Sequence, residues 1–160
     1  MLASKLRKIS ELSKKIGDDL DLIQGAGGNT SEKIGDELWV KASGCWLSDA
    51  LKENIFISVN YKNVLTNIDN QKPDPVSSEV IYSDLTKNLR PSIETTLHAI
   101  MPYKYVVHTH SINCIANTIS KENLISLKEK MNDLNWSLVA YTKPGLDLAR
   151  KIRESLRPGV

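Results

Sequence analysis

The stretch of residues 91–111 contains every histidine of the chain, together with one carboxylate. Residues 105–110 are predicted to form a β-strand, because β-branched and aromatic residues follow one another there without a breaker. Side chains alternate between the two faces of a strand, so His108 and His110 face the same side, with their Cα atoms roughly 6.5–7 Å apart. A zinc ion, with Zn–N bonds of about 2.0–2.1 Å, can bridge two imidazoles in this arrangement. The pattern therefore indicates half of a metal site.

A helix just upstream supplies the carboxylate. Pro91 and Ser92 mark its entrance, because the residue before a proline is disfavoured in the helical region and a serine can cap a helix. Glu94 and His98 are four residues apart and so share one face of this helix. Glu94 can then face the same metal as the two later histidines, or line its pocket. Taken alone, it is an ordinary first-turn glutamate favoured by the helix dipole, and a lone His-x-His is a pair of half-exposed histidines.

A second group of residues that could do chemistry is the glycine-rich loop Gly25–Ser31, which reads GAGGNTS. Its glycines allow the backbone to approach a ligand closely, and consecutive N–H groups in such loops form anion-binding concavities. A dinucleotide-binding fingerprint is not favoured, since Thr30 stands where that motif needs a glycine and a polar helix precedes the loop where it needs a strand. A plain glycine turn remains the alternative. Further along, Ser43 and Gly44 form a turn that can place a hydroxyl and an open N–H at the rim of a pocket.

The elements that must position these groups are indicated by the spacing of apolar residues. Amphipathic helices are expected over residues 2–17, 92–100, 112–119, 121–134 and 144–156, and strands over residues 37–42, 54–59, 105–110 and 136–141. The helix over residues 112–119 is expected to pack behind the histidine strand. Residues 60–90 carry the weakest pattern, with a helix or an exposed excursion over residues 79–89.

Composition restricts the class of protein. A chain of 160 residues is most simply one domain, and its 41% hydrophobic and 25% charged residues are ordinary for a globular protein. A net charge of +2 argues against nucleic acid or an acidic membrane as a partner. Two cysteines do not make a disulfide scaffold, and no run of 18 apolar residues could span a membrane. The sequence therefore predicts a cytoplasmic domain.

Four motifs taken together carry a resemblance to a known family. They are GAGGNTS, WVKASG, RPSIETTLHA and VVHTHS, in this order between residues 20 and 118. In order and spacing they resemble the class II aldolase/adducin family, and they are most similar to members in which this domain precedes a short-chain dehydrogenase domain. The resemblance implies an α/β fold with three α/β/α layers around a mainly antiparallel central sheet. It also implies assembly as a homotetramer.

The same resemblance implies an activity and a site. The activity is a retro-aldol cleavage of a ketose phosphate into dihydroxyacetone phosphate and an aldehyde, dependent on zinc or another divalent metal. Glu94 would be the catalytic acid/base, and His98 would support the site or pack the helix. The metal would be bound by His108 and His110. The substrate phosphate would be held by residues of two loops and a helix entrance, namely Gly28, Asn29, Ser43, Gly44 and Ser92.

Two departures from the family pattern qualify this expectation. The family takes a third metal-binding histidine from a later strand, whereas no histidine follows His110. Many sugar-phosphate aldolases have two serines before the glutamate, whereas this chain has Ser92 and then Ile93. The sequence therefore predicts a domain over residues 1–160 that is incomplete at its C-terminal end. The alternatives to an aldolase are a related epimerase or dehydratase, and a non-catalytic, adducin-like association module.

Overall fold

The computed structural model describes residues 2–156, apart from the side chains of residues 2 and 3. Its centre is a five-stranded sheet in the order β4-β3-β2-β1-β5, in which every neighbouring pair is antiparallel. The strands are β1 (Asn29–Ile34), β2 (Glu37–Lys41), β3 (Phe56–Asn60), β4 (Val80–Ile81) and β5 (Tyr105–His108). The sheet therefore pairs the strand that follows the glycine-rich loop with the histidine strand, although some 75 residues separate them in the sequence.

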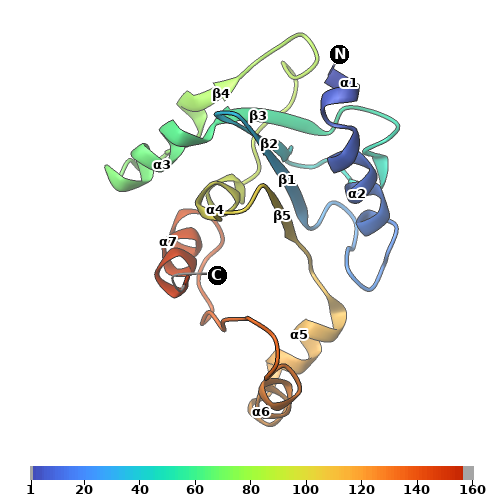
Figure 1. Cartoon of the computed structure of the whole chain (residues 1–160), viewed down its shortest axis with the longest axis vertical. Coiled ribbons are helices and arrows are strands. Elements are labelled where there is room, and N and C mark those ends of the chain that lie inside the picture. The colour runs from blue at the N-terminus through green and yellow to red at the C-terminus, as the bar shows by residue number, and fades with distance from the viewer. Residues whose placement is uncertain (1, 157–160) are drawn as a thin grey trace.

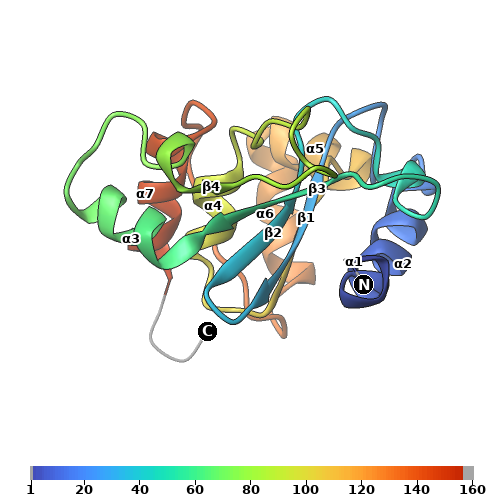
Figure 2. The same ribbon diagram turned by 90° about the horizontal axis from the view of Figure 1, so that it is seen from above.

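Helices cover both faces of this sheet (Figures 1 and 2). One side carries the N-terminal helices and a short 3-10 helix, namely α1 (Leu2–Lys5), α2 (Arg7–Gly17) and η1 (Leu47–Asp49). The other side carries α3 (Tyr61–Asp69), α4 (Thr95–Ile100) and α7 (Leu146–Ser155). The remaining elements are η2 (Ser77–Glu79), α5 (Ile112–Ile119) and α6 (Lys121–Lys130).

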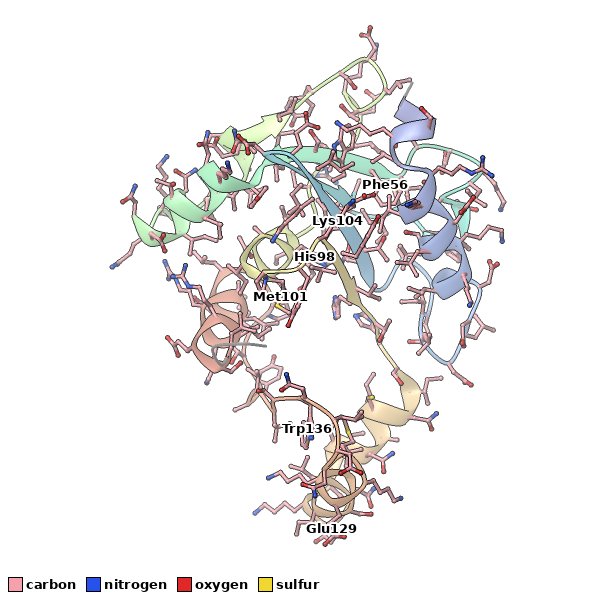
Figure 3. All side chains as sticks on the ribbon, viewed as in Figure 1. Phe56, His98, Met101, Lys104, Glu129 and Trp136 are labelled. Carbon is pink, nitrogen blue, oxygen red and sulfur yellow. The ribbon has the colours of Figure 1, made fainter. Side chains whose placement is uncertain are left out.

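The alternation of side chains along the central strands explains why two layers of helices are needed. Leu38 and Val40 of β2 are completely buried against α3, α4 and α7, in a cluster that includes Ala149. Trp39 of β2 and Phe56 of β3 point to the opposite face and pack with α2; Figure 3 labels Phe56 on that side of the sheet. Both faces of the sheet are thus apolar, and each needs its own cover. The expected three-layer α/β/α fold is confirmed.

The expected strands and helices are confirmed in part. The helix expected over residues 2–17 is interrupted at Leu6 and becomes α1 and α2. Residues 136–141, predicted as a strand, have no regular structure, and the helix considered over residues 79–89 is replaced by the two-residue strand β4 and a series of turns. Both stretches carry β-branched or apolar residues, but nothing pairs with the first and the second only adds an edge to β3.

Two of the longer elements were not expected from the sequence. The strand β1 begins at Asn29, inside the stretch interpreted as a loop, and the helix α3 occupies part of the weakly patterned stretch of residues 60–90. The sequence of β1, NTSEKI, is polar and does not indicate a strand, yet the first four residues of β1 are all buried. Hydrogen bonding to α2 and α4 satisfies several of its polar side chains, and that support comes only from the tertiary fold.

Helix α5 does not pack behind the histidine strand as predicted. None of its residues is buried, and Ile112, Ile115 and Ile119 are 49%, 49% and 78% exposed. Figure 1 shows α5 and α6 extending away from the sheet, beyond the end of β5.

Within residues 2–156, none of the helices has the length and apolar character that a membrane-spanning helix would require.

Candidate functional site

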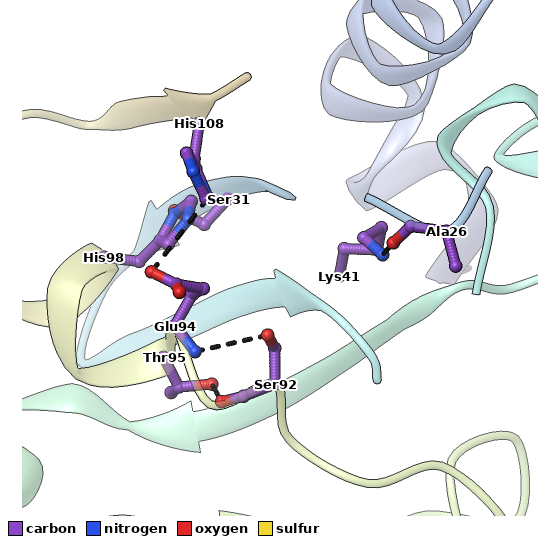
Figure 4. Close-up of polar contacts among 8 residues, drawn as sticks. All are labelled: Ala26, Ser31, Lys41, Ser92, Glu94, Thr95, His98 and His108. Carbon is purple, nitrogen blue, oxygen red and sulfur yellow. Dashed lines mark hydrogen bonds and ion pairs between the residues drawn. The ribbon is translucent and has the colours of Figure 1, made fainter. Parts of the chain in front are cut away.

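The sheet and α4 bring together residues that lie far apart in the sequence. Asn29 is the first residue of β1 and lies opposite His108, the last residue of β5. Glu94 stands at the N-terminal end of α4, and its Oε2 atom is 4.0 Å from Nδ1 of His108 (Figure 4). His110 lies just beyond β5, and its ring meets the His108 ring edge to face, with 5.0 Å between the ring centroids. The predicted metal and acid/base residues therefore form one cluster.

This cluster concentrates the unsatisfied polar atoms of the molecule. Residues 2–156 contain seven buried side-chain nitrogen or oxygen atoms without a hydrogen-bond partner. Four belong to this corner of the fold: Asn29 Oδ1, Glu94 Oε2, His98 Nε2 and His108 Nδ1. A buried polar atom without a partner costs about 1–3 kcal/mol, and native proteins keep few of them outside sites that bind something. The arrangement is therefore that of a site prepared for polar ligand atoms.

Burial sets the protonation of these groups. Burial raises the pKa of the Glu94 carboxyl above its usual range, and the nearby His110 ring opposes this shift. Burial also lowers the pKa of His108, with smaller contributions from His110 and Lys41. The 4.0 Å separation of Glu94 and His108 is too long for a hydrogen bond, so burial rather than their pairing governs both groups. A neutral His108 keeps a lone pair available, and a carboxylate with a raised pKa is a stronger base than an exposed one.

The position of Glu94 depends on how β1 holds α4. Ser31 Oγ lies 2.7 Å from Nδ1 of the completely buried His98, and this hydrogen bond joins the middle of α4 to the sheet. Two residues further along β1, Lys33 donates hydrogen bonds to the carbonyl oxygens of Ala99 and Met101. Residues two apart on a strand share a face, so Ser31 and Lys33 act on α4 together. Helix α4 is thereby fixed lengthwise on β1, with Glu94 toward His108.

The glycine-rich loop reaches the histidines by close backbone approach. Gly28 has a φ of +66°, and a Cβ atom there would lie 2.8 Å from the His108 carbonyl oxygen and 2.2 Å from Cδ1 of Ile23. A Cβ atom on Gly27 would lie 2.9 Å from Nδ1 of His110. The glycines are therefore required for contact with β5 as well as for the turn. The loop is tied to the sheet again where His110 donates its backbone N–H to the carbonyl of Leu22 at 2.9 Å.

The other predicted phosphate ligands lie around the entrance of α4. Ser43 and Ser92 both line a cavity of about 570 Å³. The Ser92 hydroxyl accepts the backbone N–H of Glu94 at 3.2 Å, so it supports the start of α4 as predicted, although the helix itself begins at Thr95. Gly44 has a φ of +78°, and the space where its Cβ would stand is open. Asn29 thus lies opposite His108, and Ser92 is hydrogen-bonded to the backbone of Glu94. Glu94 in turn approaches His108, with 4.0 Å between Oε2 and Nδ1.

Lys41 is a residue of this region that the sequence analysis did not single out. Its side chain is 2% exposed, and its ammonium donates hydrogen bonds to the carbonyl oxygens of Ala26 at 2.9 Å and Cys45 at 2.7 Å. It therefore links the glycine-rich loop to the turn that contains Ser43 and Gly44. Burial lowers the pKa of this lysine, and the Cys45 thiol opposes the shift. The sequence signal for Lys41 is a lysine inside the predicted strand ELWVKA, close to a serine-glycine turn, because a charged side chain in a buried strand needs polar partners.

The two histidines predicted to bind a metal ion lie side by side. His108 and His110 present adjacent imidazoles, and the unpartnered His108 Nδ1 and Glu94 Oε2 are atoms that a cation would satisfy. Catalytic zinc sites nevertheless take three protein ligands, and within residues 2–156 no three His, Cys, Asp or Glu side chains are arranged to hold a metal ion. The predicted metal role of His108 and His110 therefore stays a prediction.

Comparison with known proteins agrees with this architecture. The family described as "Class II Aldolase and Adducin N-terminal domain" matches residues 7–160. A Bacillus subtilis (strain 168) protein named "Uncharacterized oxidoreductase YuxG" is 31% identical over 156 residues, which is 90% of this chain and 22% of that protein. The solved N-terminal class II aldolase domain of a conserved Thermoplasma acidophilum protein superposes with a TM-score of 0.72 at 28% identity. That comparison covers 95% of this chain and 75% of the other. This chain thus spans about a fifth of the length of the curated relative.

Proposed function

The chain belongs to the class II aldolase and adducin N-terminal domain family, and we propose that it is an aldolase-type lyase that depends on zinc or another divalent metal. The proposed reaction is the retro-aldol cleavage of a ketose phosphate into dihydroxyacetone phosphate and an aldehyde. The observation that carries this proposal is the buried Glu94 carboxylate, which faces His108 inside a cluster of four unpartnered polar atoms. A purely structural module has no reason to keep such a cluster.

Glu94 is proposed to move the proton. Its carboxyl is 7% exposed, and burial raises its pKa toward the pH at which it would work, which is the requirement for an efficient general acid/base. The hydrogen bond from the Glu94 backbone to Ser92 and the attachment of α4 to β1 hold the carboxyl in place. A positioned carboxyl of this kind contributes about 10²–10⁴-fold to a proton-transfer step.

The neutral donors around the cluster are proposed to bind the substrate phosphate. These are the backbone N–H groups of Gly28 and Gly44 and the side chains of Asn29, Ser43 and Ser92. Glycine-rich turns with left-handed residues, such as Gly28 and Gly44, form concavities of N–H groups that suit an anion. The role of Lys41 in this proposal is to hold the two loops at a fixed separation through its bonds to Ala26 and Cys45.

The metal is proposed to be held by His108 and His110, with its remaining ligands supplied by Glu94, water or a neighbouring subunit. When bound, it would act as a Lewis acid on the oxygen atoms of the substrate. A homotetramer in the cytoplasm, acting on a small sugar phosphate, is part of the same proposal. The exposed isoleucines of α5 support assembly, because an unpartnered apolar helix face is typical of surfaces that become covered.

The incomplete set of metal ligands favours a second candidate, a non-catalytic association module of the adducin kind. A related epimerase or dehydratase would share the metal and phosphate groups with an aldolase. The measured reaction products separate these enzymes from one another, and the metal content separates all of them from the association module.

The first test is the amount of zinc bound per chain, measured by elemental analysis on wild type, His108→Ala and Cys114→Ala. We expect about one equivalent in wild type and a loss of metal in His108→Ala with little change in melting temperature, because His108 is partly exposed and unpartnered. Cys114 is an exposed thiol on α5 and controls for adventitious binding, so its variant should keep the metal.

The second test is turnover of Glu94→Gln on a ketose phosphate that wild type cleaves. We expect the rate to fall about 10²–10⁴-fold while the metal content stays the same, because the amide keeps the shape of the side chain and cannot transfer the proton. A wild-type chain without metal and without cleavage would favour the association module. A Glu94→Gln variant with the full rate would remove Glu94 from the mechanism.

A further inference from the structure

The cavity beside the entrance of α4 is large enough for a small phosphorylated molecule. Its volume of about 570 Å³ lies in the range of roughly 300–1,000 Å³ that is typical of small-molecule sites. It is bounded by the proline-rich loop of residues 73–77 and by residues 90–93. Ser43 and Ser92 open into it, and Thr96 lies in its wall. The cavity therefore adjoins Glu94, which follows Ser92 by two residues.

Two residues with charged side chains line this cavity, Asp74 and Arg90, and their charges are in different situations. The Asp74 carboxylate accepts the backbone N–H groups of Val76 and Ser77, both at 3.0 Å, and hydrogen bonds from Ser77 and Val76 lower its pKa. Arg90 is exposed, and among residues 2–156 its guanidinium has no hydrogen-bond or ion-pair partner. The cavity consequently holds one guanidinium without an ion pair, and its one carboxylate, Asp74, is hydrogen-bonded to its own loop.

The backbone of Arg90 is anchored to the turn expected to bind phosphate. Its carbonyl oxygen accepts the backbone N–H of Ser43 at 2.9 Å, and the next residue, Pro91, forms an isolated antiparallel bridge with Ala42. These contacts fix the start of the Arg90 side chain at the same rim of the cavity as Ser43. The position of Arg90 is thus set by the sheet, although the residue itself lies in a loop.

A second observation in the same cavity indicates a polar ligand. Thr96 is 4% exposed, lines the cavity, and its hydroxyl is buried without a partner. A buried threonine hydroxyl normally bonds to a backbone carbonyl or to another polar group, so this one is left unsatisfied next to the cavity. The cavity itself combines the guanidinium of Arg90 with the hydroxyls of Ser43 and Ser92.

We propose that Arg90 binds the phosphate monoester of the substrate in this cavity and makes the site selective for phosphorylated over neutral sugars. This inference rests on the proposed function and adds a charged residue to a set of donors that is otherwise neutral. A guanidinium matches two oxygen atoms of a phosphate at once, which a serine hydroxyl or a single N–H cannot do.

The test is a calorimetric titration of wild type, Arg90→Gln, Arg90→Lys and Lys87→Gln with inorganic phosphate. Lys87 is an exposed cation of the same loop that does not line the cavity, so Lys87→Gln makes the same change in net charge. We expect Arg90→Gln to weaken phosphate binding by about tenfold or more, because a charged hydrogen-bonded pair is lost. Arg90→Lys should recover part of the affinity, and Lys87→Gln should resemble wild type.

Equal phosphate affinities of Arg90→Gln and Lys87→Gln would overturn the inference, and so would a wild-type chain that binds no phosphate. Melting temperatures of the variants establish that a loss of affinity is not a loss of the fold. Zinc content is measured on the same samples and should be unchanged by Arg90→Gln, because Arg90 is absent from the histidine cluster. The phosphate titrations therefore test the role of Arg90. The proposed lyase activity is tested separately, by the metal content and the cleavage assay.

Discussion

His98 shows how a single residue of this site depends on its surroundings. Its imidazole is completely buried, hydrogen-bonded to Ser31 on one nitrogen and unpartnered on the other. Burial lowers the pKa of His98 to about 3, and the neighbouring His108 and Lys33 act in the same direction. The ring is therefore neutral in the folded protein at physiological pH.

This depressed pKa predicts a loss of stability in mild acid. The unfolded chain protonates His98 near pH 6.5 and the folded chain only near pH 3, so the unfolded state binds more protons between these values and stability falls as the pH falls. Between pH 7.5 and pH 5.5, His98 should cost wild type about 1.4 kcal/mol of unfolding free energy. Urea unfolding at the two pH values, on wild type and His98→Gln, measures this contribution.

The glutamine variant is expected to be less stable than wild type at pH 7.5 because it repacks a completely buried site. Its stability should nevertheless depend less on pH, since the group that titrates has been removed. The same pH dependence in both proteins would contradict a neutral, buried His98.

At the scale of elements, the glycine-rich loop and β1 set the geometry of the site. The loop brings its backbone against β5 at Gly28, and β1 then presents Asn29, Ser31 and Lys33 on one face toward His108 and α4. One strand therefore aligns both of the elements that carry the proposed catalytic and metal-binding residues. A shift of β1 along the sheet would therefore move Glu94 and His108 relative to each other.

Two glycines of the same loop allow the close approach to be measured. Gly25 and Gly28 both have positive φ values, +58° and +66°, but only a side chain at Gly28 would collide with its surroundings. Gly25→Ala should therefore cost about 1–2 kcal/mol of unfolding free energy for the left-handed conformation alone. Gly28→Ala should cost roughly 1–3 kcal/mol more, because the His108 carbonyl belongs to the sheet and cannot move easily.

Chemical unfolding of the two variants under the same conditions gives the difference directly. Gly25→Ala serves as the matched control for backbone strain. If Gly28→Ala were no less stable than Gly25→Ala, the loop could not be packed against β5 in solution.

At the scale of the whole molecule, the fold divides into a well-packed body and a projecting pair of helices. The sheet, α2, α3, α4 and α7 share the apolar core, whereas α5 and α6 contain no buried residue. Helix α5 presents Ile112, Ile115 and Ile119 to its surroundings, and it follows the proposed metal ligand His110 after a single residue. Assembly on this face would place a second chain beside the histidines.

The proposed homotetramer predicts that a charge on this face disrupts assembly. Light scattering on wild type should give about four times the 17.9 kDa mass of one chain, and Ile115→Asp should shift the mass toward that of one chain, because a buried interface tolerates an unpaired carboxylate poorly. The melting temperature of the separated chain should change little, since Ile115 is 49% exposed and contributes nothing to the core.

Ile125→Asp on α6 is the comparison variant, with a 61% exposed isoleucine in the neighbouring helix. A wild-type chain that is monomeric at all concentrations would contradict the tetramer. A tetramer that survives Ile115→Asp would show that the subunits meet elsewhere.

The sequence alone determined the family, the layered fold and the composition of the candidate site. Periodic apolar residues predicted α2 and α7 closely, because in these helices a buried face alternates with an exposed one. Short motifs predicted Glu94, His108 and His110 as one group, and the structure brings them together. The glycine-rich loop was predicted to have an unusual backbone conformation, and Gly28 has a positive φ; Gly44, predicted to lie in a turn, has one as well.

Only the tertiary structure decided which polar residues are buried and what they contact. The polar strand β1 has no apolar pattern of its own, and its burial depends on pairing with β2 and β5 and on hydrogen bonds to helices distant in sequence. The same holds for Lys41, whose partners Ala26 and Cys45 meet only when the loop and the turn are folded together. Conversely, α5 has an apolar sequence and yet remains exposed, since no element of residues 2–156 covers it. Local spacing fixes which residues can share a face, whereas long-range packing fixes whether that face is buried.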